Sequence, residues 1–288
     1  MRPKPLAGIR ILDLTRLLPG PMCTLHLADM GAEVIKIEDP RAGDYGRSLG
    51  PVKRQSAGLF LAVNRNKRGL RLDLKQAAGR EVFLRLARNA DAVVEGFRPG
   101  VMQRLGIGYP ELKQLNPRLV FCSITGYGQD GPWSRRAGHD LNYCALAGVA
   151  DQVGVAGGEP AIPNFLLGDL LGGGLTAAMG ILAALVEAGR SGEGRHVDVA
   201  MADAVLAHTI MPLAARIAGQ PVPPRGEDLF SGREACYTLY RTADRRHMAV
   251  AALERKFWDE LCDALGRPDL KPLHLAAGDD GERAKREL

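Results

Sequence analysis

Apolar and polar positions along the first two thirds of the chain alternate between strand-like and helix-like patterns. Residues 9–14 and 33–38 are short apolar runs that predict buried strands. Between them, residues 22–30 have a helical pattern that stops at Gly31, and glycine commonly ends a helix. A strand, a helix and a second strand in this order predict a β-α-β unit and hence a parallel sheet.

The same alternation continues to about residue 200 and predicts an α/β fold with a doubly wound parallel sheet. Residues 169–188 form the longest predicted helix, which is apolar on nearly all sides and is therefore expected near the centre of the domain. The other predicted strands are 70–74, 92–95, 119–125 and 196–200, and the other predicted helices are 77–88, 101–105, 109–116 and 202–218.

The last part of the chain follows a different pattern. A proline-rich segment, 221–226, predicts a linker. Beyond it, strands over 237–240 and 247–252 are joined by a turn at Asp244 and followed by a helix over 255–265, which together predict a smaller α+β unit. We expect a large domain over 1–200, a connecting helix and linker over 201–224, and a small α+β domain over 225–288.

Composition narrows the class of protein. Hydrophobic residues make up 46% and charged residues 25%, as in soluble globular proteins. The net charge of +5 is dispersed, without a basic block and interleaved aromatics, so nucleic-acid binding is not indicated. The five Cys residues form no C-x-x-C pair, so neither a metal site nor a disulfide framework is expected. No signal peptide is apparent and the longest apolar stretch, 175–185, is too short to span a bilayer, so we expect a cytoplasmic protein that does not bind membranes.

Asp169 is the first candidate for chemistry, because it lies in an apolar, glycine-rich run. Such a setting perturbs the pKa of a carboxyl group, and perturbed carboxyl groups are common at catalytic sites. The alternative is that Asp169 caps the helix that follows, where the macrodipole favours a carboxylate. His139 and Asp140 form a second polar cluster, in which the His is either a proton carrier or a structural residue. The first β-α turn lacks a G-x-G-x-x-G fingerprint, so nicotinamide binding is not indicated.

Many motifs in one order resemble the class III CoA-transferase family (CaiB/BaiF type). The resemblance extends from Leu6 to about Asp263. Its motifs are residues 6–14, 19–21, 27–38, Gly43-Asp44 with Arg47, 66–68, 72–75, 97–101, 116–119, 126–129 and Gly168-Asp169.

The resemblance implies a Rossmann-like large domain, a smaller domain and an interlocked homodimer. Its active site is expected between the large domain of one chain and the small domain of the other. The ligand it implies is an acyl-CoA, with no cofactor beyond CoA itself as part of the substrate. The substrate and CoA contacts implied by position are Lys75, Gly96, Phe97, Arg98, Arg104, Asp140 and Tyr143.

Two chemistries occur in the family, and both involve the position of Asp169. In its racemases the matching Asp moves a proton on one face of the α-carbon, a His at the position of His139 works on the other face, and a Glu at the position of Glu254 supports it. In its transferases the Asp attacks the thioester and later holds CoA as an aspartyl thioester. The trio favours a 2-methylacyl-CoA racemase or epimerase. The alternative hypothesis is a CoA transferase acting between carboxylic acids, and the third hypothesis is an inactive CoA-binding member of the family.

Departures from the family pattern affect the acyl pocket and the end of the chain. Residues 230–236 replace a Gly-Gly-Ala-Pro-type segment, and Asp39 stands where racemases place an Arg that contacts CoA. Family members continue beyond the position of Leu288, so the small domain is expected to be incomplete at its C-terminus.

Overall fold

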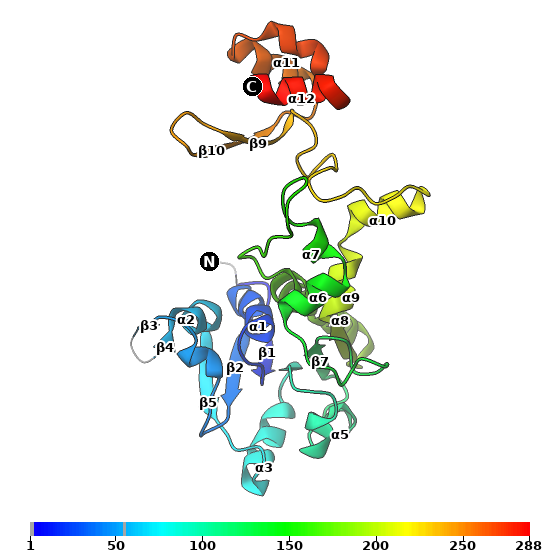
Figure 1. Ribbon diagram of the computed structural model, residues 1–288. Helices are drawn as coiled ribbons and strands as arrows, with labels where there is room; N and C mark the ends of the chain where they lie inside the picture. Colours follow the sequence, from blue (N-terminus) through cyan, green and yellow to red (C-terminus); the bar gives the residue numbers. More distant parts are fainter. Residues whose placement is uncertain (1–2, 54–55) are drawn as a thin grey trace. The chain divides into compact units, whose positions relative to one another are not determined.

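A computed structural model describes residues 3–53 and 56–288, and it divides into two compact units (Figure 1). The first unit comprises Met1–Ala147 and Asn164–His208. The second comprises Gly148–Pro163 and Thr209–Leu288. The expected domain boundaries after residues 200 and 224 stay predictions.

The first unit is built on a six-stranded sheet in the order β5-β2-β1-β6-β7-β8. Every neighbouring pair is parallel, and the strand order reverses between β1 and β6. This arrangement confirms the α/β fold with a doubly wound parallel sheet. The strands are β1 Arg10–Asp13, β2 Glu33–Glu38, β5 Lys67–Arg71, β6 Ala92–Glu95, β7 Val120–Thr125 and β8 His196–Ala200.

Helices cover both faces of the sheet and give the unit two hydrophobic cores. Successive residues of β1 point to opposite faces, so Ile11 belongs to one core and Leu12 to the other. The helices α1 (Pro19–Asp29) and α8 (Thr176–Ser191) contribute to the core of Ile11, and α3 (Ala77–Ala87) contributes to that of Leu12. Because both faces are buried, the strands are continuous apolar runs in the sequence. The smaller helices are α2 Gly58–Asn64, α4 Val101–Arg104, α5 Tyr109–Leu115, α6 Asp140–Leu146 and α9 Met201–Ala207, with a 3₁₀ turn at Tyr45–Ser48 and a short antiparallel pair, β3 Val52–Lys53 and β4 Ser56–Ala57.

The long apolar helix differs from the prediction at its start. It begins as a π-helix, Leu167–Leu175, and continues as α8. Its glycines permit close packing, because a Cβ on Gly173 would lie 2.6 Å from the Cβ of Pro19 and one on Gly172 would lie 2.9 Å from the carbonyl of Met201. Although the segment Leu167–Ser191 is long and apolar enough to cross a membrane, α8 packs on β7 and β8 and contributes to a hydrophobic core of the first unit.

Two further elements differ from their predicted limits. The strand predicted at 70–74 lies three residues earlier in the structure, as β5. The ammonium of Lys67 forms a buried ion pair with Asp13 at 3.2 Å, and this pairing allows a charged residue to begin the strand. The single helix predicted over 202–218 is two helices, α9 and α10 (Ile210–Ile217), separated where the chain passes from the first unit to the second.

The second unit has a small core of its own. Trp258 is fully buried in this core, and its indole Nε1–H donates to the carbonyl of Leu270 at 3.1 Å. An antiparallel pair, β9 (Tyr237–Arg241) and β10 (His247–Ala251), matches the predicted hairpin. The helices are α7 Val149–Gln152, α10, α11 Arg255–Ala264 and α12 Gly278–Glu287, with a 3₁₀ segment at Pro268–Leu273.

Candidate active site

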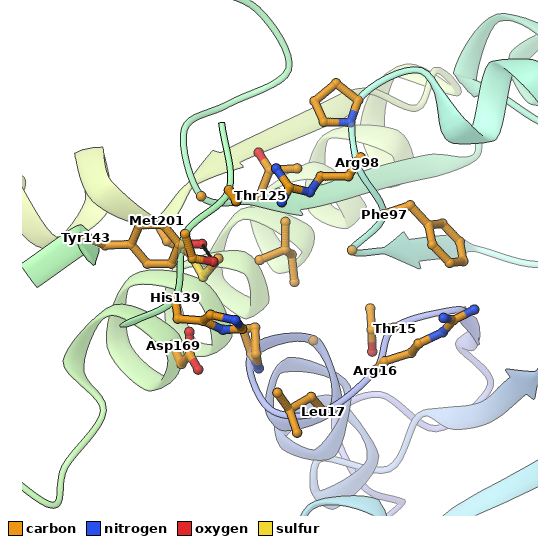
Figure 2. Close-up of a pocket in the computed structure, with 18 of the residues that line it drawn as sticks. Thr15, Arg16, Leu17, Phe97, Arg98, Thr125, His139, Tyr143, Asp169 and Met201 are labelled. Carbon is orange, nitrogen blue, oxygen red and sulfur yellow. Dashed lines mark hydrogen bonds between the residues drawn. The ribbon is translucent and has the colours of Figure 1, made fainter. Parts of the chain in front are cut away.

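A cavity of about 280 Å³ lies where the strand order of the sheet reverses. The loops that leave the carboxyl ends of β1 and β6 form two of its walls, through Thr15 with Arg16 and through Phe97 with Arg98 (Figure 2). Thr125, the last residue of β7, lies beside them. Open α/β sheets bind their ligands at this position, because the loops diverge there and leave a crevice.

Buried ion pairs hold the loop after β1. Asp13 accepts hydrogen bonds from the backbone N–H of Thr15 at 2.9 Å and from its hydroxyl at 2.5 Å. Burial opposes ionisation of Asp13, but the ammonium groups of Lys67 and Lys36, together with the hydrogen bonds from Thr15 and Thr24, outweigh that effect and lower its pKa. Asp13 therefore stays ionised and fixes the first residue of the cavity wall.

A second buried ion pair, between Lys36 and Asp44, also supports the loop after β1. The ammonium of Lys36 lies 3.0 Å from Asp44 and donates to the carbonyl of Thr15 at 2.8 Å. Asp44 in turn accepts from the backbone N–H of Leu17 at 3.0 Å. Leu17 has a φ of 64°, a left-handed conformation that leucine rarely adopts, so the carboxylate of Asp44 offsets local strain.

Tyr143 is fixed in the wall by two glycines. Its hydroxyl donates to the carbonyl of Gly138 at 2.6 Å, and a Cβ on either Gly126 or Gly138 would lie 2.6 Å from its ring. Burial is the largest of the effects that raise the pKa of Tyr143 to about 12, so the phenol stays protonated at neutral pH. Directly before α6, the backbone N–H of His139 donates to the side chain of Asn142 at 2.9 Å, which positions the start of that helix.

Asp169 lies in the first turn of the π-helix and is only 9% exposed. The helix begins before it, with Leu166 at the N-cap, so the alternative in which Asp169 caps the helix is wrong. Its backbone N–H donates to Asp140 at 3.0 Å. Burial, and then the negative charge of Asp140, raise the pKa of Asp169 to about 6, while His139 acts in the opposite direction.

The structure brings most of the expected site residues together. His139 and Asp169 come from different elements and face the same cavity, as Figure 2 shows. Gly96, Phe97, Arg98 and Tyr143 line that cavity as well, and Asp140 supports Asp169 from behind.

Three expected residues lie elsewhere. Lys75 lines a neighbouring cavity of about 200 Å³, together with Phe97. Arg104 lines another, of about 550 Å³, together with Arg98. Glu254 belongs to the second unit, where it directly precedes α11 and is exposed.

Several lining residues were missed by the sequence prediction. Thr15, Arg16 and Thr125 stand at the carboxyl ends of β1 and β7, so the rule for the reversal point of a doubly wound sheet could have identified them. Tyr45 and Met201 follow no comparable signal in the sequence. Among residues 3–53 and 56–288, no group of three His, Cys, Asp or Glu side chains could hold a metal ion.

Comparisons with known proteins identify similar chains. A family model described as "CoA-transferase family III" matches residues 6–288. Human alpha-methylacyl-CoA racemase is 38% identical over 98% of this chain and 70% of its own length. Mouse succinyl-CoA:glutarate CoA-transferase is also 38% identical, over 93% of this chain and 61% of its own length. A crystal structure of a CaiB/BaiF family protein from Brucella suis is 32% identical, with a TM-score of 0.84 over 99% of this chain and 76% of that chain.

Proposed function

Because this chain belongs to CoA-transferase family III, whose members act on acyl-CoA, we propose that it is a 2-methylacyl-CoA racemase or epimerase. The observation that carries this proposal is the presence of His139 and Asp169 in one cavity. Racemisation removes the α-proton from one face of the thioester and returns a proton to the other face of the planar enolate. It therefore needs two proton carriers, whereas covalent CoA transfer needs one nucleophile.

The electrostatics of Asp169 suit proton transfer. A carboxyl group with a pKa of about 6 is a stronger base than an ordinary aspartate, yet is still mainly ionised at pH 7. In this proposal the carboxylate accepts the α-proton, the electron pair moves onto the thioester carbonyl to form the enolate, and the protonated imidazole of His139 delivers a proton to the opposite face. The reverse direction exchanges the two roles.

The cavities beside the site suggest how the CoA portion binds. Leu72 and Leu74 give the cavity of Lys75 an apolar wall suited to the adenine ring, and the ammonium of Lys75 is suited to a phosphate. In the other neighbouring cavity, Arg98 and Arg104 offer further cations. We therefore keep Lys75, Gly96, Phe97, Arg98 and Arg104 as CoA contacts, with the loop after β6 guiding the thioester toward Asp169.

The role of Glu254 depends on assembly. We propose an interlocked homodimer in which the small domain of the second chain supplies Glu254 to the site, where it supports His139. Size-exclusion chromatography with light scattering tests the dimer. A monomer that racemised its substrate at full rate would contradict this part of the proposal.

CoA transfer between carboxylic acids is the second candidate. It is supported by the equal identity to a succinyl-CoA:glutarate CoA-transferase and by the carboxylate of Asp169 in the cavity wall. Here Asp169 attacks the thioester carbonyl, CoA leaves as a thiolate, and a mixed anhydride remains. The thiolate attacks the aspartyl carbonyl of this anhydride, which releases the first carboxylate and forms an aspartyl-CoA thioester. The second carboxylate attacks that thioester and displaces the thiolate, which then attacks the new acyl group to give the product acyl-CoA and free Asp169. Hydroxylamine added during turnover traps these acyl intermediates as a hydroxamate on Asp169.

Deuterium incorporation separates the two chemistries. The protein is incubated with a 2-methylacyl-CoA in deuterated water, and deuterium at the α-carbon is measured by mass spectrometry. We expect exchange in the wild type and a large loss in His139→Ala. The matched control is His247→Ala, an exposed histidine of the hairpin in the second unit. Absence of exchange would contradict the racemase, and CoA binding without either reaction would favour an inactive CoA-binding member.

A further inference from the structure

Thr125 carries a buried side-chain hydroxyl at the cavity. The residue ends β7 and is 8% exposed. Among residues 3–53 and 56–288, its Oγ1 has no hydrogen-bond partner. Leaving a buried hydroxyl unpaired destabilises a folded protein, so such groups are rare and each one calls for a structural or functional explanation.

The other hydroxyl groups of the cavity are already engaged or exposed. Thr15 donates to Asp13, Ser134 to the carbonyl of Gly131, and Tyr143 to the carbonyl of Gly138. Tyr45, at 52% exposure, is open to water. Thr125 is thus the buried cavity hydroxyl that remains available as a donor in the described part of the chain.

We propose that the hydroxyl of Thr125 donates a hydrogen bond to the carbonyl oxygen of the bound acyl thioester. The inference rests on the proposed function, but it holds for both chemistries. Negative charge develops on that oxygen when the α-proton leaves, and it also develops there when a carboxylate attacks the carbonyl. A positioned donor at this oxygen stabilises either transition state.

The position of Thr125 fits this role. Figure 2 shows it beside the cavity that His139 and Asp169 face, on a rigid strand end rather than a mobile loop. The backbone N–H of Asp169 is already bound to Asp140, so it is engaged within the protein. The guanidinium of Arg98 donates to the carbonyl of Arg136. Because a hydroxyl carries no charge, it also does not perturb the proton transfer proposed for His139 and Asp169.

Two substitutions at Thr125 test the proposal. Thr125→Val keeps the shape and removes the hydroxyl, so we expect kcat to fall on the order of 100-fold with little change in KM. Thr125→Ser should restore most of kcat. Because the native hydroxyl has no partner in the part of the chain that the structure describes, the melting temperature of Thr125→Val should equal or exceed that of the wild type. The matched control, Thr24→Val, removes a buried hydroxyl that does have a partner, Asp13 at 2.5 Å, and should melt at a lower temperature.

A binding experiment gives a readout that does not depend on turnover. The affinities of wild type and Thr125→Val are compared for an acyl-CoA thioester and for the matching thioether, which lacks the carbonyl oxygen. We expect the wild type to prefer the thioester and Thr125→Val to lose that preference. A preference retained in Thr125→Val, or a kcat equal to that of the wild type, would overturn the inference. Failure of the proposed function is seen separately, as a wild type that neither exchanges deuterium nor yields a hydroxamate.

Discussion

Asp169→Asn should abolish activity and at the same time stabilise the folded protein at neutral pH. Its carboxyl group has a folded-state pKa of about 6 against an ordinary value of 3.8. That difference corresponds to about 3 kcal/mol of unfolding free energy, an upper limit because the group borders a solvent-accessible cavity. Between these two pKa values the folded state binds more protons than the unfolded state, so stability falls as the pH rises through this range. An amide has no charge to bury and escapes this loss.

The assay is urea denaturation of the wild type and Asp169→Asn at a series of pH values from 4 to 8. Both are made in a Trp258→Phe background, so that Trp133, in the first unit, is the remaining tryptophan. The two proteins should have similar stability near pH 4, and the amide should gain stability progressively up to about pH 6 and hold that advantage above it. A difference in stability that did not change with pH would refute the reasoning, because it would show that the carboxylate is not destabilised by burial.

Three further predictions concern buried groups outside the proton-transfer pair. Burial raises the pKa of Glu95 from 4.5 to about 7, so stability falls over that pH range, and Glu95→Gln should gain about 3 kcal/mol at pH 8 but not at pH 4 in urea titrations. Asp44→Ala removes the carboxylate 3.0 Å from the buried ammonium of Lys36 and should cost about 3–5 kcal/mol, measured by the urea midpoint; an unchanged midpoint would contradict it. Trp258→Ala should cost about 3–5 kcal/mol by circular dichroism, because it empties the core of the second unit.

The sheet was predictable from the sequence because its strands are buried on both faces. The limits of β2, β6 and β8 agree with the predicted runs at 33–38, 92–95 and 196–200. Such strands are continuous apolar segments, and the helices between them end at clear glycine and polar signals.

Other features depend on tertiary contacts and left no local signal. Lys67 enters β5 because Asp13, distant in sequence, neutralises it inside the first unit. The residues before α8 form a π-helix, which places Asp169 inside the helix instead of at its cap. The unpartnered hydroxyl of Thr125 is invisible in the sequence, because hydrogen-bond satisfaction depends on every neighbour in three dimensions.

The distribution of paired and unpaired polar groups around the cavity explains how this fold supports chemistry. Beneath the cavity, Asp13 and Asp44 form ion pairs with buried lysines, and together they hold the loop after β1 in a strained conformation. At the cavity surface, burial and the charge of Asp140 raise the pKa of Asp169 more than His139 lowers it, and the hydroxyl of Thr125 has no partner among the described residues. If the reactive side chains also had to hold the loop in place, their positions would change once the ligand left. Because the ion pairs hold the loop, the reactive side chains stay in place although their own interactions are incomplete. An acyl thioester then supplies the missing interactions when it binds.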